Sequence, residues 1–168
     1  MTDYIIRPIT EKDVEGFRDS VDYVAREKKY LAFFEAPPLE ISRAFVLDNI
    51  ENKNPQFVVE AEGRIVGWCD VVRKELPIYS HTGVLGIGLL PVWRGRGIGR
   101  QLMQKTIDAA IEQGFTRIEL GVRAHNKNAQ HLYESLGFFI EGLKRRECKV
   151  NGVYEDSYIM SLLVDKAA

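Results

Sequence analysis

Cysteine is scarce in this chain: Cys69 and Cys148 are its two thiols, and they stand far apart in a sequence of 168 residues. Both fall in strand-like runs, where a cysteine usually serves as a small buried apolar side chain. A disulfide framework or a cysteine metal site needs more thiols at closer spacing. We therefore expect neither, and no bound metal.

Long hydrophobic runs are also missing. No apolar stretch approaches the roughly 20 residues that span a bilayer, and the first residues lack the basic segment and apolar core of an export signal. These absences predict a soluble, cytoplasmic protein without a membrane partner.

An excess of charge of one sign is absent as well. The chain carries 23 lysines and arginines against 24 aspartates and glutamates, a formal net charge of -1. A nucleic-acid-binding domain normally shows a basic excess, so nucleic acid is not expected as a partner. Because the chain has no repeat, low-complexity stretch or linker and is of ordinary domain size, residues 1–168 are predicted to form one domain.

Segments with the period of a strand alternate with segments that have the period of a helix. In chain order, the expected elements are a strand at 4–8, helices at about 10–28 and 41–50, strands at 56–61, 64–73 and 81–90, a helix at 98–114, a strand at 117–122, a helix at 129–136, and strands at 139–150 and 154–164. Glu62-Gly63 and Asn151-Gly152 are expected to turn the two hairpins. This order, βααβββαβαββ, predicts an α/β sandwich with a mixed, partly antiparallel sheet.

Residues 94–100 (RGRGIGR) form a glycine-rich turn between an apolar strand and the start of a helix. Glycine permits left-handed backbone angles, and the amides of such a turn and of a helix N-terminus converge on anions such as phosphate. Arg94, Arg96 and Arg100 add positive charge nearby. The spacing is neither G-x-G-x-x-G nor that of a P-loop, which indicates a different phosphate ligand. A turn whose arginines merely face solvent is the alternative.

This segment resembles the core motif of the GNAT superfamily of N-acetyltransferases, (Q/R)-x-x-G-x-(G/A), which stands here as RGRGIG at 94–99. The second signature of that superfamily, N-x-x-A-x-x-L-Y-x-x-x-G-F, stands as NKNAQHLYESLGF at 126–138. The spacing of the motifs and the order of the elements are also those of the superfamily. The resemblance covers essentially the whole domain, and it implies transfer of an acetyl group from acetyl-CoA to an amine.

The resemblance further implies that acetyl-CoA lies in a V between two splayed parallel strands, near 85–90 and 117–122. Gly86 and Gly88 would let the pantetheine arm pair with main chain, unless they only ease a bend of the sheet. The Leu89 amide would be the oxyanion donor, and the amides of 96–100 would face the pyrophosphate. The residues implied to bind the cofactor are Leu89, Leu90, Arg94, Gly95, Arg96, Gly97, Ile98, Gly99, Arg100, Asn126 and Tyr133.

Acetyl transfer to an amine needs a general acid for the departing thiolate and a general base for the amine. The second signature assigns the acid to Tyr133, although this tyrosine also continues an apolar helix stripe typical of a core. Asn126 would orient CoA or cap the helix. Glu119 is our candidate base, acting through water, with His81 and His125 as alternatives.

The acceptor is less well defined. Family members that acetylate protein N-termini often carry an acid in L-E-V-R, where this chain has LGVR at 120–123. Gly121 cannot be a base, so a small-molecule amine or amino acid is the expected substrate, with ribosomal-type N-terminal acetylation as the alternative. A non-catalytic acyl-CoA-binding module and an arginine-mediated interaction domain are rivals from other classes. Exposed sheet edges predict a homodimer.

Overall fold

The computed structural model describes residues 3–165, in which four α-helices and one seven-stranded sheet follow the predicted order. The helices are α1 (Val14–Arg26), α2 (Leu39–Glu51), α3 (Ile98–Glu112) and α4 (Lys127–Ser135). The strands are β1 (Tyr4–Pro8), β2 (Gln56–Ala61), β3 (Arg64–Arg73), β4 (Thr82–Leu89), β5 (Arg117–Arg123), β6 (Phe139–Val150) and β7 (Val153–Leu163). The predicted first helix is divided, because residues Glu11–Asp13 form a 3-10 turn ahead of α1.

The strands lie side by side in the order β1-β2-β3-β4-β5-β7-β6, and every described pair except β4-β5 is antiparallel. This confirms the expected mixed, mostly antiparallel sheet. Both predicted hairpin turns have two residues with positive φ, 53° and 73° at Glu62 and Gly63, and 49° and 81° at Asn151 and Gly152. That conformation matches the twist of the flanking strands and favours Asn-Gly.

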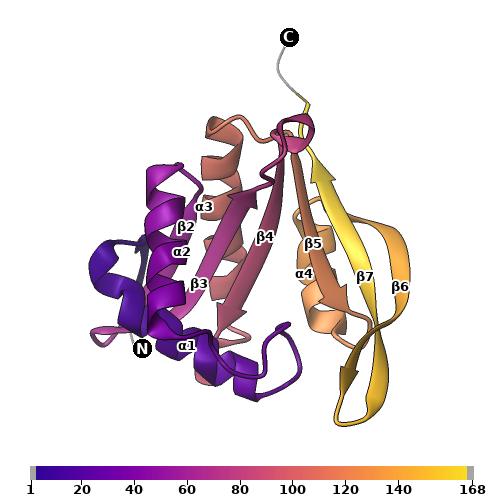
Figure 1. Cartoon of the computed structure of the whole chain (residues 1–168), viewed down its shortest axis with the longest axis horizontal. Helices are drawn as coiled ribbons and strands as arrows, with labels where there is room; N and C mark the ends of the chain where they lie inside the picture. Colours follow the sequence, from indigo (N-terminus) through magenta and orange to yellow (C-terminus); the bar gives the residue numbers. More distant parts are fainter. Residues whose placement is uncertain (1–2, 166–168) are drawn as a thin grey trace.

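Helices cover both faces of the sheet, because neighbouring residues of a strand point to opposite faces. Val58 and Trp68 pack in a cluster with α1 and α2, including Phe17, whose ring lies 5.9 Å from that of Trp68. Val59 and Cys69, the next residues along, belong to a second buried cluster with α3 and α4. Figure 1 shows the resulting layers, with the sheet between the two helix pairs.

The parallel strands β4 and β5 separate shortly after they begin. Their register consists of Thr82↔Arg117, Gly83↔Ile118 and Val84↔Glu119, and no later residues of the two strands are paired. Figure 1 shows the strands close together at their beginnings and apart at their arrowheads. The V that the resemblance implied is therefore present, and it opens toward the carboxyl ends of the strands.

Candidate active site

The main chain of β4 is the first wall of the V. In an antiparallel pair, alternate residues direct both their N–H and C=O groups to the same neighbour. The Leu90 amide donates to the Val66 carbonyl at 2.9 Å, and the Lys74 amide donates to the Thr82 carbonyl at 3.0 Å. With a continuous β3-β4 register, these bonds assign the even-numbered residues of β4 to β3. The residues whose main chain faces the gap are the odd-numbered ones, Leu85, Ile87 and Leu89.

This alternation corrects two of the predicted contacts. The Leu90 amide is used in bonding to Val66, so it does not face the cofactor. Gly86 and Gly88 pair with β3 and cannot offer main chain to pantetheine. Their role lies in their missing side chains, since a Cβ at Gly88 would clash with the ring of Trp68. The Leu89 amide faces the gap, and its role as oxyanion donor stays a prediction.

The N-terminus of α3 is the second part of the site. Gly97 is its N-cap, with φ 77°, and no side chain caps the helix. The first intrahelical bond runs from the Gln101 amide to the Gly97 carbonyl at 3.3 Å, so the amides of Ile98, Gly99 and Arg100 precede it without a partner among residues 3–165. A Cβ at Gly97 would meet nothing within 4 Å. Open, unpaired amides at a helix N-terminus fit a pyrophosphate.

Two further glycines shape this turn. Gly95 has φ 72° and, like Gly97, needs the left-handed conformation that side chains disfavour. Gly99 is different, because its Cβ position lies 3.6 Å from methyl carbons of both Leu89 and Leu132. This is an ordinary packing distance, so Gly99 marks the place where α3, α4 and the end of β4 meet.

The three arginines of the motif have different surroundings. Arg94 is committed elsewhere: its Nε donates to the Leu89 carbonyl at 2.9 Å, and its guanidinium contacts both carboxylate oxygens of Glu27 at 3.1 Å. These contacts compete with a contact between Arg94 and the cofactor, which stays a prediction. Arg100 donates to Ser135 of α4 at 2.6 Å and is exposed, as is Arg96, so these two charges remain next to the α3 amides.

Tyr133 reaches the V from α4. Its side chain is 8% exposed and packs in the cluster that also holds Cys69. Burial raises the pKa of the phenol well above its ordinary value, and the nearby Cys69 thiol raises it further. Because Cys69 pairs with Ile87 in the sheet, the hydroxyl lies near the part of β4 that has left β5. No described residue hydrogen-bonds this hydroxyl, which keeps its proton free for a ligand.

Asn126 caps α4, because its Oδ1 accepts from the Ala129 amide at 3.2 Å. Of the two roles considered for Asn126, capping the helix and orienting CoA, the structure shows the capping role. The α4 N-terminus lies directly after the end of β5, so both walls of the V lead into helix N-termini.

Glu119 does not have the properties of a base. It lies at the closed end of the V, opposite Val84. Lys74 and Arg117 contact its two oxygens at 2.5 and 3.1 Å. Although burial acts to raise the pKa of Glu119, these two cations outweigh it and hold the pKa below its ordinary value. A carboxylate so paired is a weak proton acceptor, and we withdraw the assignment.

The alternative histidines lie at opposite ends of the V. His81 precedes β4 at the closed end, where its carbonyl accepts from the amides of Thr116 and Arg117. His125 follows β5 at the open end, and its Nε2 lies 3.6 Å from Glu155. Of these two, His125 alone lies at the open end of the V.

The loop between α1 and α2, residues 27–38, is bonded to both walls of the V. Glu27 contacts Arg94 beside β4, and the Tyr30 ring lies 4.9 Å from the Arg94 guanidinium. On the other wall, Arg123 at the end of β5 donates to the Leu31 carbonyl at 2.7 Å and to Glu155 at 2.8 Å. Arg123 is not among the predicted site residues, although an arginine that ends an apolar strand is a visible signal in the sequence.

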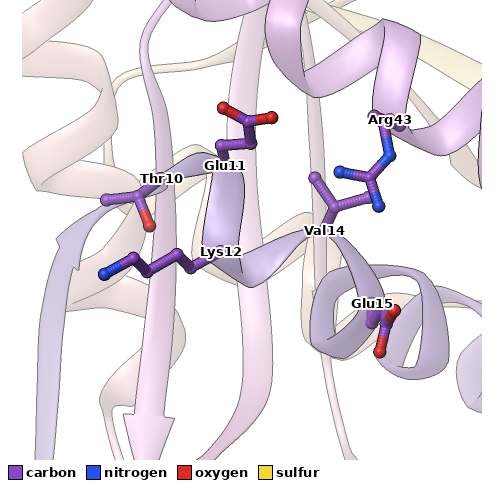
Figure 2. A pocket seen from close by; sticks show the side chains of 6 residues that line it. All are labelled: Thr10, Glu11, Lys12, Val14, Glu15 and Arg43. Atoms are coloured by element: carbon purple, nitrogen blue, oxygen red, sulfur yellow. The ribbon is translucent and has the colours of Figure 1, made fainter.

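The surface formed by residues 3–165 includes two sizeable hollows. One of about 510 Å³ adjoins the open end of the V and is lined by Lys29, Tyr30, His125, Asn126, Lys127, Asn128 and Glu155. The other, of about 800 Å³, lies between the start of α1 and α2. Figure 2 shows that its charged side chains do not converge on one point, since Lys12 and Arg43 point to different sides. The first hollow therefore suits an acceptor better than the second.

No helix among residues 3–165 is long and apolar enough to cross a membrane. Residues 3–165 also contain no group of three His, Cys, Asp or Glu side chains placed to hold a metal ion. Cys69 and Cys148 are both free thiols.

Known proteins resemble this chain over most of its length. Residues 22–138 match the acetyltransferase (GNAT) family. An L-amino acid N-acetyltransferase of Escherichia coli is 33% identical over 63% of this chain and 66% of its own, so the match spans just under two thirds of that relative. Spermidine N(1)-acetyltransferase of Vibrio cholerae is 30% identical over 83% of this chain and 78% of its own. The N-alpha-acetyltransferase RimI of Mycobacterium tuberculosis is 38% identical over 58% of this chain and 59% of its own.

The fold also matches a solved structure that contains the cofactor. A Salmonella typhimurium acetyltransferase structure with acetyl-CoA superposes with a TM-score of 0.92, covering 99% of this chain and 97% of that one at 20% identity. At that identity the likeness speaks for the fold. Since the family match spans well over half of the residues, this chain belongs to the acetyltransferase (GNAT) family.

Proposed function

We propose that this protein transfers the acetyl group of acetyl-CoA to the primary amine of a small molecule or amino acid. The observation that carries the proposal is the V: β4 leaves β5 after Val84, and the main chain of Ile87 and Leu89 faces the gap. A pantetheine arm can pair with this main chain as an added strand. The unpaired amides of α3 at the open end suit the pyrophosphate, and Arg96 and Arg100 supply charge beside them.

Tyr133 would act as the general acid. The amine nitrogen bonds to the acetyl carbon, the carbon–sulfur bond breaks, and the phenol gives its proton to the thiolate. A phenol whose pKa is raised by burial holds its proton at neutral pH until that strong base forms. The Leu89 amide would stabilise the carbonyl oxygen as it gains negative charge.

A small acceptor is supported by two of the relatives, whose names specify amino acids and spermidine. The α1–α2 loop, held to both walls by Arg94 and Arg123, restricts access to the hollow beside the V. The second candidate is acetylation of protein N-termini, which the RimI relative favours. A cytoplasmic location is part of the proposal.

The test is a panel of amines, amino acids and N-terminal peptides, assayed by release of the CoA thiol. We expect turnover with small amines and little with peptides; the reverse would favour the second candidate. A parallel melting experiment tests cofactor binding, because a ligand at a hundredfold excess over its Kd stabilises the native state by about 2.7 kcal/mol. No shift with CoA would contradict both candidates and favour an interaction domain.

A further inference from the structure

Asp70 of β3 is a buried carboxylate that the proposed mechanism has not used. Its side chain is 7% exposed. No lysine, arginine, hydroxyl or amide among the described residues contacts it, and burial is the one cause that acts on its proton affinity. A buried carboxylate is normally paired or hydrogen-bonded, because desolvating the charge is costly. Asp70 has no such partner among the described residues, and its oxygens, unlike Gln56 Nε2, are not fully enclosed, so they keep some contact with solvent.

Asp70 lies beside the open part of β4. Its register partners are Gln56 on β2 and Gly86 on β4, so the three residues form a row on the face covered by α1. The Oδ1 atom of Asp70 lies 3.5 Å from the position that a Cβ of Gly86 would take. Since Gly86 has no side chain, nothing on β4 covers the carboxylate there. Ile87, whose main chain faces the gap, is the next residue.

Gln56 supplies an independent observation. It is 4% exposed, and its Nε2 atom is buried without a hydrogen-bond partner among the described residues. Its Oε1 accepts from Asn49 Nδ2 at 3.0 Å, and Asn54 Nδ2 donates to Asn49 Oδ1 at 3.2 Å. This polar row runs from α2 to the strand neighbour of Asp70 and ends in an unused donor. A donor and an acceptor left open side by side are the usual surroundings of a bridging water.

We propose that Asp70 is the general base of the acetyl transfer and that Gln56 positions it, an inference that rests on the proposed function. The amine enters as an ammonium ion and gives one proton to the Asp70 carboxylate, directly or through one water. Its nitrogen then bonds to the acetyl carbon, the carbon–sulfur bond breaks, and Tyr133 protonates the sulfur. The second nitrogen proton, lost as the amide forms, restores the tyrosine through water, and the Asp70 proton leaves to solvent.

The two groups approach the V from opposite faces of the sheet. Asp70 lies on the α1 face, whereas Tyr133 belongs to the cluster around Cys69 on the α3 and α4 face. Such an arrangement separates the proton acceptor from the proton donor across the reacting carbonyl. The α1–α2 loop contributes Lys29 and Tyr30 to the acceptor hollow at the open end of the V, and residues 125–128 at the start of α4 line its other side.

Burial raises the pKa of the Asp70 carboxyl to about 7, which makes it a stronger base than an exposed aspartate. The groups that face it are neutral: Gln56 on β2, Gly86 on β4 and the apolar cluster with α1 and α2. Among titratable groups, the Cys69 thiol is close enough to sense its charge. No described cation stands near enough to lower the pKa again.

The test compares Asp70→Asn with wild type on an acceptor that the amine panel has verified. Asparagine keeps the shape and removes the base, so kcat should fall by about a hundredfold to ten-thousandfold while calorimetric CoA affinity is unchanged. Asp108→Asn, an exposed carboxylate on α3, is the matched control and should keep full turnover. Gln56→Leu should lower kcat less than Asp70→Asn, since the base remains.

A second readout separates a catalytic base from a structural carboxylate. Wild-type kcat should rise with pH through an apparent pKa near 7, and Asp70→Asn should lose this dependence. Near-full turnover in Asp70→Asn, or a flat wild-type profile between about pH 6 and pH 9, overturns the assignment. Wild type that binds CoA and acetylates nothing in the panel refutes the proposed function itself, and this assignment with it.

Discussion

Among single residues, Tyr133 combines nearly complete burial with a hydroxyl that no described residue bonds. We expect Tyr133→Phe to lower turnover by about a hundredfold or more, because the thiolate would lose its proton donor. CoA affinity by calorimetry should stay close to wild type, since the phenylalanine ring keeps its packing against Phe138. Near-full turnover in the variant would show that water or the substrate protonates the thiolate and that Tyr133 is a core aromatic.

Asp70 gives a residue-scale prediction about stability. The folded protein holds the Asp70 proton up to about pH 7, whereas the unfolded chain releases it near the ordinary value of 3.8. Between these pH values the native state binds the extra proton, so the contribution of this group to stability falls as pH rises from about 4 to about 7.

Replacing Asp70 by asparagine should remove this loss of stability above about pH 4. We expect Asp70→Asn to melt at a higher temperature than wild type at pH 8 and to show a smaller advantage at pH 4. Scanning calorimetry at both pH values, with Asp108→Asn for comparison, measures the difference. Equal melting temperatures at pH 8 would mean that the buried carboxylate is compensated by a partner outside the described contacts.

At the scale of elements, the turn into α3 depends on the backbone of Gly97. Its φ of 77° is strained for any residue with a side chain, by about 1–2 kcal/mol, and most for a β-branched one. Gly97→Val should therefore move the α3 amides and abolish most of the CoA affinity measured by calorimetry.

Gly114 offers a matched control for that variant. It ends α3 on the side remote from the motif, with φ 90° and open space around its Cβ position. Gly114→Val should destabilise the fold to a similar extent and leave CoA affinity intact. If both variants bind CoA like wild type, the amides of α3 are not the phosphate site.

At the scale of the whole molecule, the sheet ends in β1 and β6. β6 is long, and apolar side chains on it and at the start of β7 are exposed: Phe139, Ile140, Leu143 and Val153. Exposed apolar side chains on an edge strand favour pairing with a second copy. We expect a homodimer by light scattering, and Leu143→Lys should shift it toward monomer. A wild-type monomer at all working concentrations would contradict this expectation.

Local sequence signals were sufficient for the order of the elements and for the motif. Asn151-Gly152 and Glu62-Gly63 select their own turn type, and the glycines at 95 and 97 have positive φ as the motif implied. These features depend on a few consecutive residues, whose conformational preferences do not need the rest of the fold. The V was available through the family resemblance, and the register of β4 and β5 shows it directly.

The tertiary structure decided which groups of the motif are free to act. The sequence suggested that Arg94 binds phosphate. In the structure its guanidinium instead contacts Glu27 of the α1–α2 loop, 67 residues away in sequence. Glu119 was the candidate base from the sequence, but in the structure Lys74 pairs with its carboxylate. No sequence pattern marks Asp70, because its lack of a charged partner arises from strand register. Charge and proton affinity depend on what lies within a few ångströms across strands and helices. The sequence by itself determined the elements and the family, whereas packing between distant segments determined which side chains remain available for chemistry.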